Sequence, residues 1–446
     1  MSSKIKILLI LPDGRVHKIS FAGFSRSMRE APLTLTTLAA LTPEDLDVGY
    51  QIIDGSVEAI PEKSDANIVG ISVLTGTSVQ AYALADQFKK NGSLVALGGV
   101  HVTLMPAEAA LHADVIFTGP AEGTWPQFLK DYSNGSYKSR YDANFSPKAV
   151  FSLPEPHRFL QPKGRYNIPN TVCATRGCIH SCDFCSITAL KNKYQKRSIS
   201  EVISEIQGIP GRLFAFNDVS LADDPEYLNN LCDSLIPLNK RWGGLATTKL
   251  LEKPELVDKM AKSGCRYLLV GFESISGYSL AETGKRFNKS DQYKEFMSLV
   301  HSCGIVIQGC FIFGFDHDHR EVFQKTIEEV HRLKIDIPRY AILTPYPGTK
   351  TFLRLQKENR IISYNWSDYD TTKVVFRPKN MSGQELFDGY RNAYRESYRI
   401  LPILKRSSGK GLSGLINLVG NLTYRRYVKK LYNTMEITPE LPICLM

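Results

Sequence analysis

The sequence of 446 residues contains no apolar run of the roughly 18–20 residues that a membrane-spanning helix needs. Its first residues, MSSKIKILLILPDG, are too short in their apolar part for a secretory signal with a cleavage site. Nine cysteines are too few for a disulfide scaffold in a chain of this length. These absences argue against a membrane-spanning or disulfide-rich secreted protein, and we expect a soluble protein of the cytoplasm.

Hydrophobic residues make up 43% of the chain and charged residues 22%, which is ordinary for globular proteins and excludes intrinsic disorder over most of its length. The length suggests two or three domains. Half of the net charge of +10 comes from residues 401–446, which hold seven Lys and Arg residues against two Glu residues. Such a basic tail can meet nucleic acid, anionic lipid or an acidic partner, or can be a solvated surface.

Residues 1–135 alternate between short, continuously apolar runs and stretches with helical spacing. Strands that are apolar on both faces predict a parallel sheet covered on both sides, so we expect a doubly wound, Rossmann-like or flavodoxin-like α/β domain. The predicted strands are Lys6–Leu11, Tyr50–Asp54, Ile68–Leu74, Leu94–Leu97 and Val115–Thr118, and the predicted helices are Leu33–Leu41, Ser78–Asn91 and Ala107–His112.

Small residues follow three of these strands, at Thr75-Gly76, Gly98-Gly99 and Gly119. In an open parallel sheet, ligands bind outside the carboxyl ends of the strands, and glycine lets them approach the backbone closely. The alternative is that these residues only form tight turns. A ligand site is therefore predicted at this edge of the sheet.

Residues 136–168 lose this periodicity and are expected to be a linker or a wrapping segment, and residues 169–376 then form a second α/β series. Six strands predict a partial (β/α)6 barrel, and residues 377–446 are predicted to be helical, with a basic tail. The strands expected in the second series are Val172–Thr175, Leu213–Asn217, Gly243–Thr248, Tyr267–Glu273, Val306–Gly314 and Tyr340–Pro345, and its helices 199–207, 225–238, 254–263, 290–302 and 320–333.

Three cysteines, Cys178, Cys182 and Cys185, lie just after the first strand of the second series. Closely spaced thiolates suit an iron–sulfur cluster or zinc. The remaining cysteines are scattered, so no second ligand pair completes a structural zinc site. A cubane held by three cysteines leaves one iron open to an exogenous ligand, and His180 within the loop is the alternative fourth ligand.

The spacing CxxxCxxC, with the aromatic Phe184 before the last cysteine, resembles the signature of the radical SAM superfamily. In that family the open iron of a 4Fe-4S cluster binds S-adenosylmethionine (SAM), and one electron cleaves a carbon–sulfur bond to give a 5′-deoxyadenosyl radical. The resemblance implies that Cys178, Cys182 and Cys185 are catalytic and hold the metal cluster, with Phe184 next to the cofactor.

Downstream segments narrow the resemblance. FAFNDVSLADDPEYL, SGCRYLLVGFESIS, CFIFGFDHD, ILTPYPGT, NWSDYD and VVFRPKNMSGQEL are similar to the subgroup with a cobalamin-binding domain ahead of the radical SAM domain. This subgroup includes hopanoid methylases, other carbon methyltransferases and a ring-forming enzyme of bacteriochlorophyll synthesis. The similarity spans roughly residues 1–400.

The resemblance also implies SAM contacts. Glu273 matches the acidic residue that takes the SAM ammonium group, with Ser274 as a hydroxyl contact, and Gly314 would let the adenosine lie close to a strand end. Asp218 matches one of a pair of acidic residues, of which Asn217 replaces the other. The alternatives are that Glu273 pairs with a lysine or arginine inside the barrel and that Asp218 caps a helix.

The acidic and histidine run 316–319 (DHDH) also attracts a metal-site interpretation. Because it follows an apolar strand, we expect it instead to lead into the next helix.

For cobalamin, the D-x-H-x-x-G motif that supplies a histidine to the cobalt is absent, since Asp13 and His17 are four residues apart. His101 is then a candidate for packing against the lower face of the cofactor, or a histidine that stabilises its loop. A domain that kept the fold and lost the cofactor is the alternative. The residues that the resemblance assigns to cobalamin are Thr75, Gly76, Gly98, Gly99, His101, Gly119 and Glu122.

The expected function is a cobalamin-dependent radical SAM enzyme that methylates an unactivated carbon. Ring closure, oxidation or rearrangement without methyl transfer is the alternative within the family. An RNA-associated modification or binding protein is the alternative from another class, suggested by the pI of about 9.0. No RNA-binding domain or RNP-like segment supports it.

The expected partners are a small-molecule substrate of apolar or lipid-like character and an electron donor such as flavodoxin or ferredoxin, and no nucleic acid is expected. Residues 411–432 place Leu, Ile and Val beside a cationic end, as interfacial helices do. Peripheral membrane contact through this tail and a helix packed on the barrel are the two interpretations.

Overall fold

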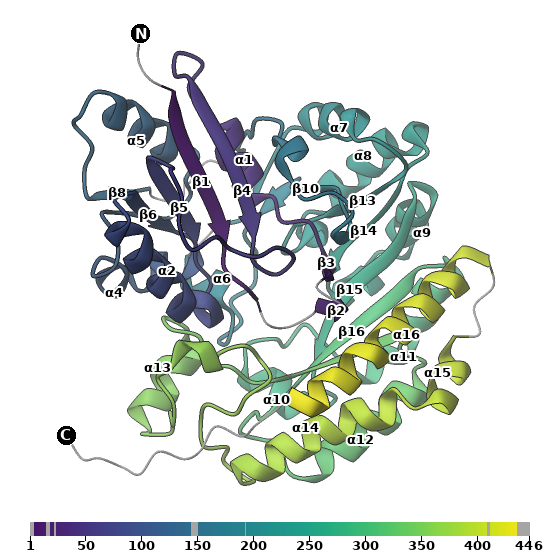
Figure 1. The fold of residues 1–446 in the computed structure, drawn as a ribbon. Coiled ribbons are helices and arrows are strands. Elements are labelled where there is room, and N and C mark those ends of the chain that lie inside the picture. Colours follow the sequence, from purple (N-terminus) through teal and green to yellow (C-terminus); the bar gives the residue numbers. More distant parts are fainter. Residues whose placement is uncertain are drawn as a thin grey trace.

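The computed structural model describes residues 4–14, 18–21, 24–143, 150–191, 193–407 and 411–434. Two α/β regions lie side by side, and the C-terminal helices cover the outer face of the second (Figure 1). The predicted fold class is confirmed: a doubly wound N-terminal region, a partial barrel and a helical C-terminal region.

The N-terminal sheet is parallel throughout, with the strand order β4-β1-β5-β6-β7-β8 among the described residues. Its first five strands follow the flavodoxin-like order 2-1-3-4-5. Neighbouring residues of β5 face separate apolar clusters on the two sides of the sheet, Ile68 on one and Val69 on the other, as the continuous apolar runs predicted. The strands are β1 (Ile5–Leu11), β4 (Val48–Asp54), β5 (Ile68–Ser72), β6 (Leu94–Gly98), β7 (Val115–Thr118) and β8 (Arg140–Asp142), and the helices α1 (Thr34–Ala40), α2 (Ser78–Lys90), α3 (Val100–Leu104), α4 (Pro106–Ala109) and α5 (Thr124–Ser133).

The second sheet is also parallel, in the sequential order β10-β13-β14-β15-β16-β17. In the described chain its first and last strands do not pair, so the barrel stays open along one side. The strands are β10 (Thr171–Val172), β13 (Leu213–Phe216), β14 (Arg241–Ala246), β15 (Cys265–Glu273), β16 (Val306–Phe313) and β17 (Ile337–Ile342), and the helices α6 (Ser186–Ala189), α7 (Ile199–Gly208), α8 (Pro225–Leu235), α9 (Pro254–Lys262), α10 (Gly277–Glu282), α11 (Tyr293–Ser302), α12 (Glu321–Arg332) and α13 (Lys350–Lys357).

A three-stranded sheet that periodicity did not predict lies beside this barrel. The hairpin β2 (Lys18–Phe21) and β3 (Phe24–Glu30) pairs with β9 (Tyr166–Ile168), which lies just before the barrel. Met28 and Glu30 of β3 reach a cavity inside the barrel. Within the described part of residues 136–168, Arg140–Asp142 thus supplies β8 to one sheet and Tyr166–Ile168 supplies β9 to another. Two further strands, β11 (Thr175–Arg176) and β12 (Gln195–Lys196), pair next to the cysteine loop.

The C-terminal helices are α14 (Gly383–Ser397), α15 (Ile400–Arg406) and α16 (Gly411–Thr434). The hydroxyl of Tyr394 in α14 donates a hydrogen bond to the Tyr340 carbonyl at 2.9 Å and accepts one from the Tyr340 backbone N–H at 3.1 Å. Asn421 of α16 donates to the carbonyl of Asp336 at 2.9 Å. The part of the tail that the structure describes is therefore packed on the barrel.

A buried charge group joins the wrapping segment to the barrel. Glu205 of α7 accepts hydrogen bonds from Arg197 (2.5 Å) and Arg158, and Arg197 also donates to the carbonyl of Cys173. Both Glu205 and Arg197 are under 5% exposed. We expect Glu205→Gln to lower the free energy of unfolding by about 3–5 kcal/mol, because it leaves buried cations without a counter-charge.

Equilibrium urea unfolding measures this effect. Glu201→Gln is the matched control, since its carboxylate lies 3.7 Å from the same Arg197 but is 41% exposed. It should cost about 1 kcal/mol or less. Equal losses in the two variants would contradict the argument.

Candidate active site

The cysteine loop lies between β11 and α6, and a buried carboxylate holds the chain that leads into it. Asp218, two residues after β13, accepts hydrogen bonds from the backbone N–H groups of Ala174 (3.1 Å) and Thr175. Burial raises the pKa of Asp218 to about 7, although these hydrogen bonds act to lower it. The helix-cap interpretation of Asp218 is wrong, because Asp224 caps α8. Its contact with SAM stays a prediction.

The three cysteines fit an iron–sulfur cluster better than a single ion. Burial raises the pKa of Cys178 to about 12 and that of Cys182 to about 11, so both are neutral thiols without iron. The three sulfurs of the loop do not all lie within 4.8 Å of one another. Zinc with Zn–S bonds of about 2.3 Å needs sulfurs about 3.8 Å apart. The sulfurs are thus not arranged around one ion, and three soft thiolate donors suit a 4Fe-4S cluster.

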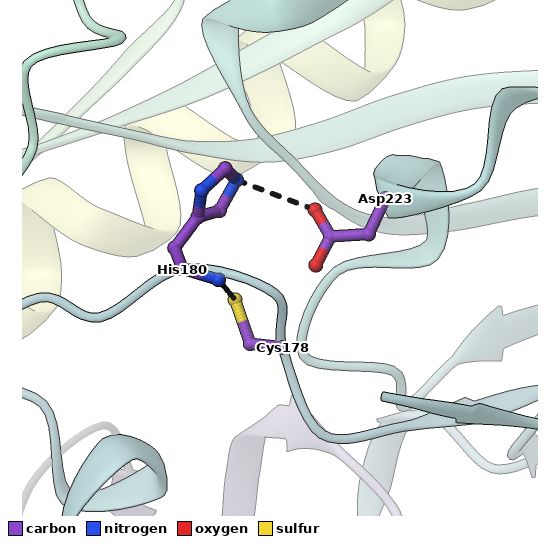
Figure 2. Close-up of side chains that lie close together, drawn as sticks. All are labelled: Cys178, His180 and Asp223. Carbon is purple, nitrogen blue, oxygen red and sulfur yellow. Dashed lines mark hydrogen bonds and ion pairs between the residues drawn. The ribbon is translucent and has the colours of Figure 1, made fainter. Parts of the chain in front are cut away.

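Cys178, His180 and Asp223 lie together at the start of this loop (Figure 2). The backbone N–H of His180 donates to Sγ of Cys178 at 3.4 Å, and the His180 ring lies 3.4 Å from the Asp223 carboxylate. The ring also stacks on Phe287 with centroids 4.0 Å apart. These contacts give His180 a supporting role in the loop. Because its ring also lies within ligand distance of Cys178 and Asp223, the alternative of a fourth ligand stays a prediction.

Asp223 supports the loop as well. It accepts a hydrogen bond from the backbone N–H of Ile179 at 3.1 Å. Burial acts to raise its pKa, but hydrogen bonds from His180, Ser220 and Ile179 hold the pKa of Asp223 below its usual value. The carboxylate therefore stays charged and fixes the loop at two points.

Glu273 ends β15 in the left-handed region, with φ of +62°. Its Oε1 accepts a hydrogen bond from Lys285 Nζ at 2.5 Å, as the barrel-pairing alternative expected. The pair lies close to the cysteine loop, because Lys285 and Glu273 both act electrostatically on Cys182. One carboxylate oxygen of Glu273 can still accept an ammonium group. The strained backbone and the buried pair are typical of a binding position.

Three further predicted SAM contacts have protein partners. The hydroxyl of Ser274 accepts a hydrogen bond from the backbone of Ser276 at 3.0 Å. The Phe184 ring lies 6.1 Å from that of Phe315. Gly314 has φ of +105°, and Leu386 and Phe376 occupy the space that a Cβ would need. The structure thus gives a packing reason for this glycine, and its adenosine contact stays a prediction.

A cavity of about 270 Å³ lies at the carboxyl edge of the N-terminal sheet and reaches the barrel. Gly98, Gly99, Gly119 and Glu122 line it. Gly99 also needs its positive φ of +103°, because a Cβ would lie 2.8 Å from the Val73 backbone. The structure therefore confirms a tight turn at Gly99, and its contact with a ligand stays a prediction.

The walls of this cavity suit one part of a large cofactor such as cobalamin. They are apolar at Leu35, Leu38, Phe117 and Trp125, and Gly98 adds no side chain. From the barrel side, Arg176 pairs with Glu122 and so closes the cavity toward the cysteine loop.

The other residues assigned to cobalamin lie apart from the described lining of this cavity. His101 is fully buried, with Nδ1 3.2 Å from Thr75 Oγ1 and Nε2 3.4 Å from Glu108. A Cβ on Gly76 would meet the Tyr369 carbonyl at 3.0 Å. Trp366 donates to Glu108 at 3.0 Å. Thr75, Gly76 and His101 thus join the two α/β regions, and the loop-stabilising interpretation of His101 has support.

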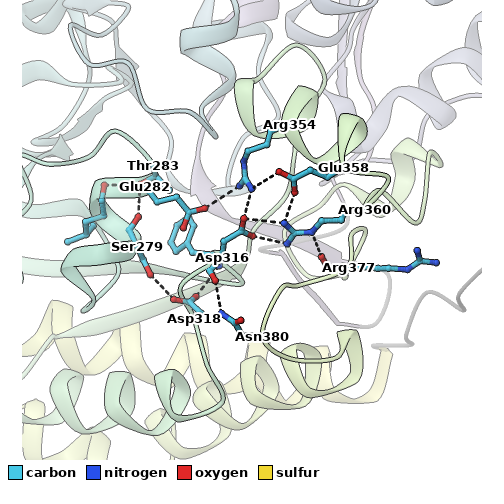
Figure 3. Close-up of polar contacts among 12 residues, drawn as sticks. Ser279, Glu282, Thr283, Asp316, Asp318, Arg354, Glu358, Arg360, Arg377 and Asn380 are labelled. Carbon is cyan, nitrogen blue, oxygen red and sulfur yellow. Dashed lines mark hydrogen bonds and ion pairs between the residues drawn. The ribbon is translucent and has the colours of Figure 1, made fainter.

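The 316–319 run takes part in a polar network rather than in a group of metal ligands (Figure 3). Asp316 pairs with Arg354 and with Arg360, the latter at 2.7 Å. Asp318 accepts hydrogen bonds from Ser279 and from the backbone of Gly314, each at 2.9 Å. The expectation that this run leads into the next helix is confirmed, since α12 begins at Glu321.

Sequence reasoning missed three residues at the site. Lys285 lies in a stretch (GKRF) without any strand or spacing signal, and Arg176 precedes the cysteine motif unremarked. Asn217 was noted only as a departure from an acidic pair, yet it lines both the cavity described above and a second one inside the barrel.

Two family models match the chain. The B12 binding domain matches residues 5–129, and the radical SAM superfamily matches residues 172–330. The solved structure of the methyltransferase TsrM from Kitasatospora setae, with cobalamin and a 4Fe-4S cluster bound, superposes with a TM-score of 0.66 at 13% identity. The match covers 97% of this chain and 100% of that chain, which shows a common fold.

Two curated relatives match over most of their length. The chain is 31% identical over 448 residues to bacteriochlorophyllide d C-12(1)-methyltransferase of Chlorobaculum tepidum, with 96% of each chain covered. It is 28% identical to bacteriochlorophyllide d C-8(2)-methyltransferase of the same organism, with 89% of this chain and 91% of that one covered. The chain therefore belongs to the cobalamin-dependent radical SAM methyltransferases, whose cofactors are a 4Fe-4S cluster, S-adenosylmethionine and cobalamin.

Proposed function

We propose that this enzyme methylates an unactivated carbon of a tetrapyrrole-type small molecule. The two relatives that match along most of the chain carry names of methyltransferases acting on bacteriochlorophyllide d, and this supports the substrate class. The apolar walls of the cavity between the two regions suit such a substrate or its neighbouring cofactor.

The residues divide the work as follows. Cys178, Cys182 and Cys185 hold the cluster. Glu273 accepts a hydrogen bond from the SAM ammonium group, while Lys285 holds the Glu273 carboxylate in place. When bound, the cluster supplies an electron that cleaves SAM, and cobalamin supplies the methyl group. An external donor such as flavodoxin or ferredoxin is proposed to reduce the cluster.

We place the cobalamin contacts in the cavity at the carboxyl edge of the N-terminal sheet, at its lining residues Gly98, Gly99, Gly119 and Glu122. We divide the chain into a cobalamin-binding unit (1–135), a connecting segment (136–168), a radical SAM unit (169–376) and a C-terminal helical region (377–446).

One observation carries the proposal. Asn217 lines both the cavity at the N-terminal sheet and a cavity of about 330 Å³ inside the barrel. The two cavities thus border the same residue. A substrate at this junction would lie next to both cofactors, away from bulk water that would quench a radical.

The test uses the full chain, reconstituted anaerobically with iron, sulfide and hydroxocobalamin. It receives a reductant, SAM with a deuterated methyl group and bacteriochlorophyllide d, and the products are analysed by mass spectrometry. We expect a chlorin product that carries the labelled methyl group. SAM cleavage without any labelled chlorin would contradict the proposed substrate.

We also propose that α16 contacts an anionic membrane surface, where an apolar substrate would be held. No described helix combines the length and the apolar character needed to span a bilayer. The helix lies along the outside of the barrel (Figure 1), and its polar residues Asn417 and Asn421 are buried while Leu415 and Val419 are more than half exposed. Arg426 and Lys429 continue the exposed face, so apolar and cationic groups meet on it.

Vesicle sedimentation tests this surface. Wild-type protein should pellet with phosphatidylglycerol-containing vesicles and stay in solution with pure phosphatidylcholine. The double variant Leu415→Asp, Val419→Asp, at the two exposed apolar residues, should lose most of this binding. Leu111→Asp, at a leucine 78% exposed on the N-terminal region, should keep it. Equal binding of both variants would rule out α16 as the contact.

A further inference from the structure

The cavity inside the barrel is a separate chamber with its own polar groups. Its polar lining residues are Glu30, Asn217, Asp218, Tyr267, Gln308, Arg339 and Tyr424. None of the three cysteines, nor Glu273, is among its described lining residues. The chamber therefore borders the predicted SAM contact Asp218, but it does not include the cysteine loop or Glu273.

Arg339 projects into this chamber from β17. Its neighbour Tyr340 faces outward, since its hydroxyl lies 2.6 Å from Ser397 of α14. Successive side chains of a strand point to opposite faces, so Arg339 faces inward. Arg339 on β17 is the register partner of Cys310 on β16, which in turn is the partner of Gly271 on β15. Gly271 lies next to the Glu273–Lys285 pair. The guanidinium is thus close below the proposed SAM position.

No protein acceptor satisfies this guanidinium in the described part of the chain, although its side chain is partly buried. Gln308 is committed elsewhere, because its carbonyl accepts from Tyr267 and its amide donates to Tyr424 at 2.8 Å. Glu30 lines the same chamber but forms no ion pair with Arg339 within 4.0 Å. An enclosed cation without an acceptor is costly to the fold, so its retention points to a ligand.

We infer that Arg339 binds a carboxylate of the substrate and so fixes the carbon to be methylated. A guanidinium matches a carboxylate with two parallel hydrogen bonds. A volume of about 330 Å³ admits a carboxylate-bearing side arm, while a tetrapyrrole ring stays at the Asn217 junction. This inference rests on the proposed function, because it assigns the propionate arm of a tetrapyrrole to the chamber.

SAM also carries a carboxylate, so the experiment must separate the two sources. The probes are pheophorbide a, which has a free propionic acid, and its methyl ester, and binding to the reconstituted full chain is followed by chlorin fluorescence. Wild-type protein should bind the acid at least tenfold more tightly than the ester, which is about 1.4 kcal/mol. Arg339→Met should remove this preference and leave ester binding unchanged.

Two further variants sharpen the comparison. Glu30→Gln removes a negative charge that would repel the carboxylate of the acid, so this variant should keep or increase the preference for the acid. Arg332→Met, at an exposed arginine paired with Glu329, should behave as wild type. Arg339→Met should also not lower the thermal midpoint, because it removes an unpaired, partly buried cation, whereas loss of a structural arginine would lower it.

The outcomes are distinguishable. Equal binding of acid and ester to wild-type protein overturns the carboxylate anchor and leaves the tetrapyrrole proposal standing. If wild-type protein binds neither chlorin, both the carboxylate anchor and the tetrapyrrole proposal are overturned. If Arg339→Met raises the KM for SAM in a cleavage assay without acceptor, the guanidinium serves SAM and the inference is wrong.

Discussion

Cys182→Ala is expected to abolish both cluster binding and SAM cleavage. The cleavage rate should fall to the background rate that the reductant alone gives. Cys182 is the most buried cysteine of the loop, at 9% exposed, and its loop has no spare thiol. Two thiolates cannot hold the cubane with one iron open, so the cofactor should be lost during reconstitution. Iron content, the visible absorption of the cluster and 5′-deoxyadenosine formation measure this.

Cys303→Ala is the matched control. Cys303 ends α11, away from the loop, and is a free, partly exposed cysteine. It should keep the iron content and cleavage rate of wild-type protein. Retention of a full cluster in Cys182→Ala would show that the loop is not the cluster site.

Glu273→Gln is expected to separate SAM binding from cluster binding. A charge-assisted hydrogen bond contributes about 1.5–3 kcal/mol, so its loss should raise the KM for SAM by about 10–100-fold. The cluster spectrum should persist, because the cysteine loop is anchored by Asp218 and Asp223 rather than by Glu273. The measurement is 5′-deoxyadenosine formation at varied SAM concentration, together with iron content.

Glu282→Gln controls for the removal of a carboxylate on the same side of the barrel. Glu282 is half-buried and pairs with Arg354 at 3.2 Å, within the network of Figure 3. It should leave the KM for SAM unchanged. An unchanged KM in Glu273→Gln would refute the ammonium assignment.

The strands and helices of both α/β regions could be predicted from the sequence because their apolar runs are buried on both faces. β15 and β16, for example, extend over 265–273 and 306–313, close to the predicted Tyr267–Glu273 and Val306–Gly314. The β2–β3 hairpin escaped prediction, since KISF and FSRSMRE carry no continuous apolar run. Beyond the hairpin itself, only β3 pairs with another strand among the described residues, the distant β9.

The site was predictable where a local motif carries it and not where long-range contacts do. The three cysteines share eight positions, so their loop could be recognised at once. Lys285 and Arg339 owe their places to strand register and to a buried pair, which no local pattern encodes. Thr75, Gly76 and His101 were assigned to cobalamin from family-like segments. In the structure Gly76 lies against Tyr369, nearly 300 residues further along the chain, and His101 contacts Glu108.

If one chain holds a cluster and cobalamin in two separate sites, a variant that fills one cavity should lose only one of the two cofactors. A side chain at Gly98 fits without strain, since the nearest atom to an added Cβ is 3.5 Å away, and it would extend into the cavity at the N-terminal sheet. After anaerobic reconstitution and desalting, wild-type protein should retain stoichiometric cobalamin and a full complement of iron. Gly98→Leu should lose the cobalamin absorption and keep the iron. Equal cobalamin content in the two proteins would contradict the account.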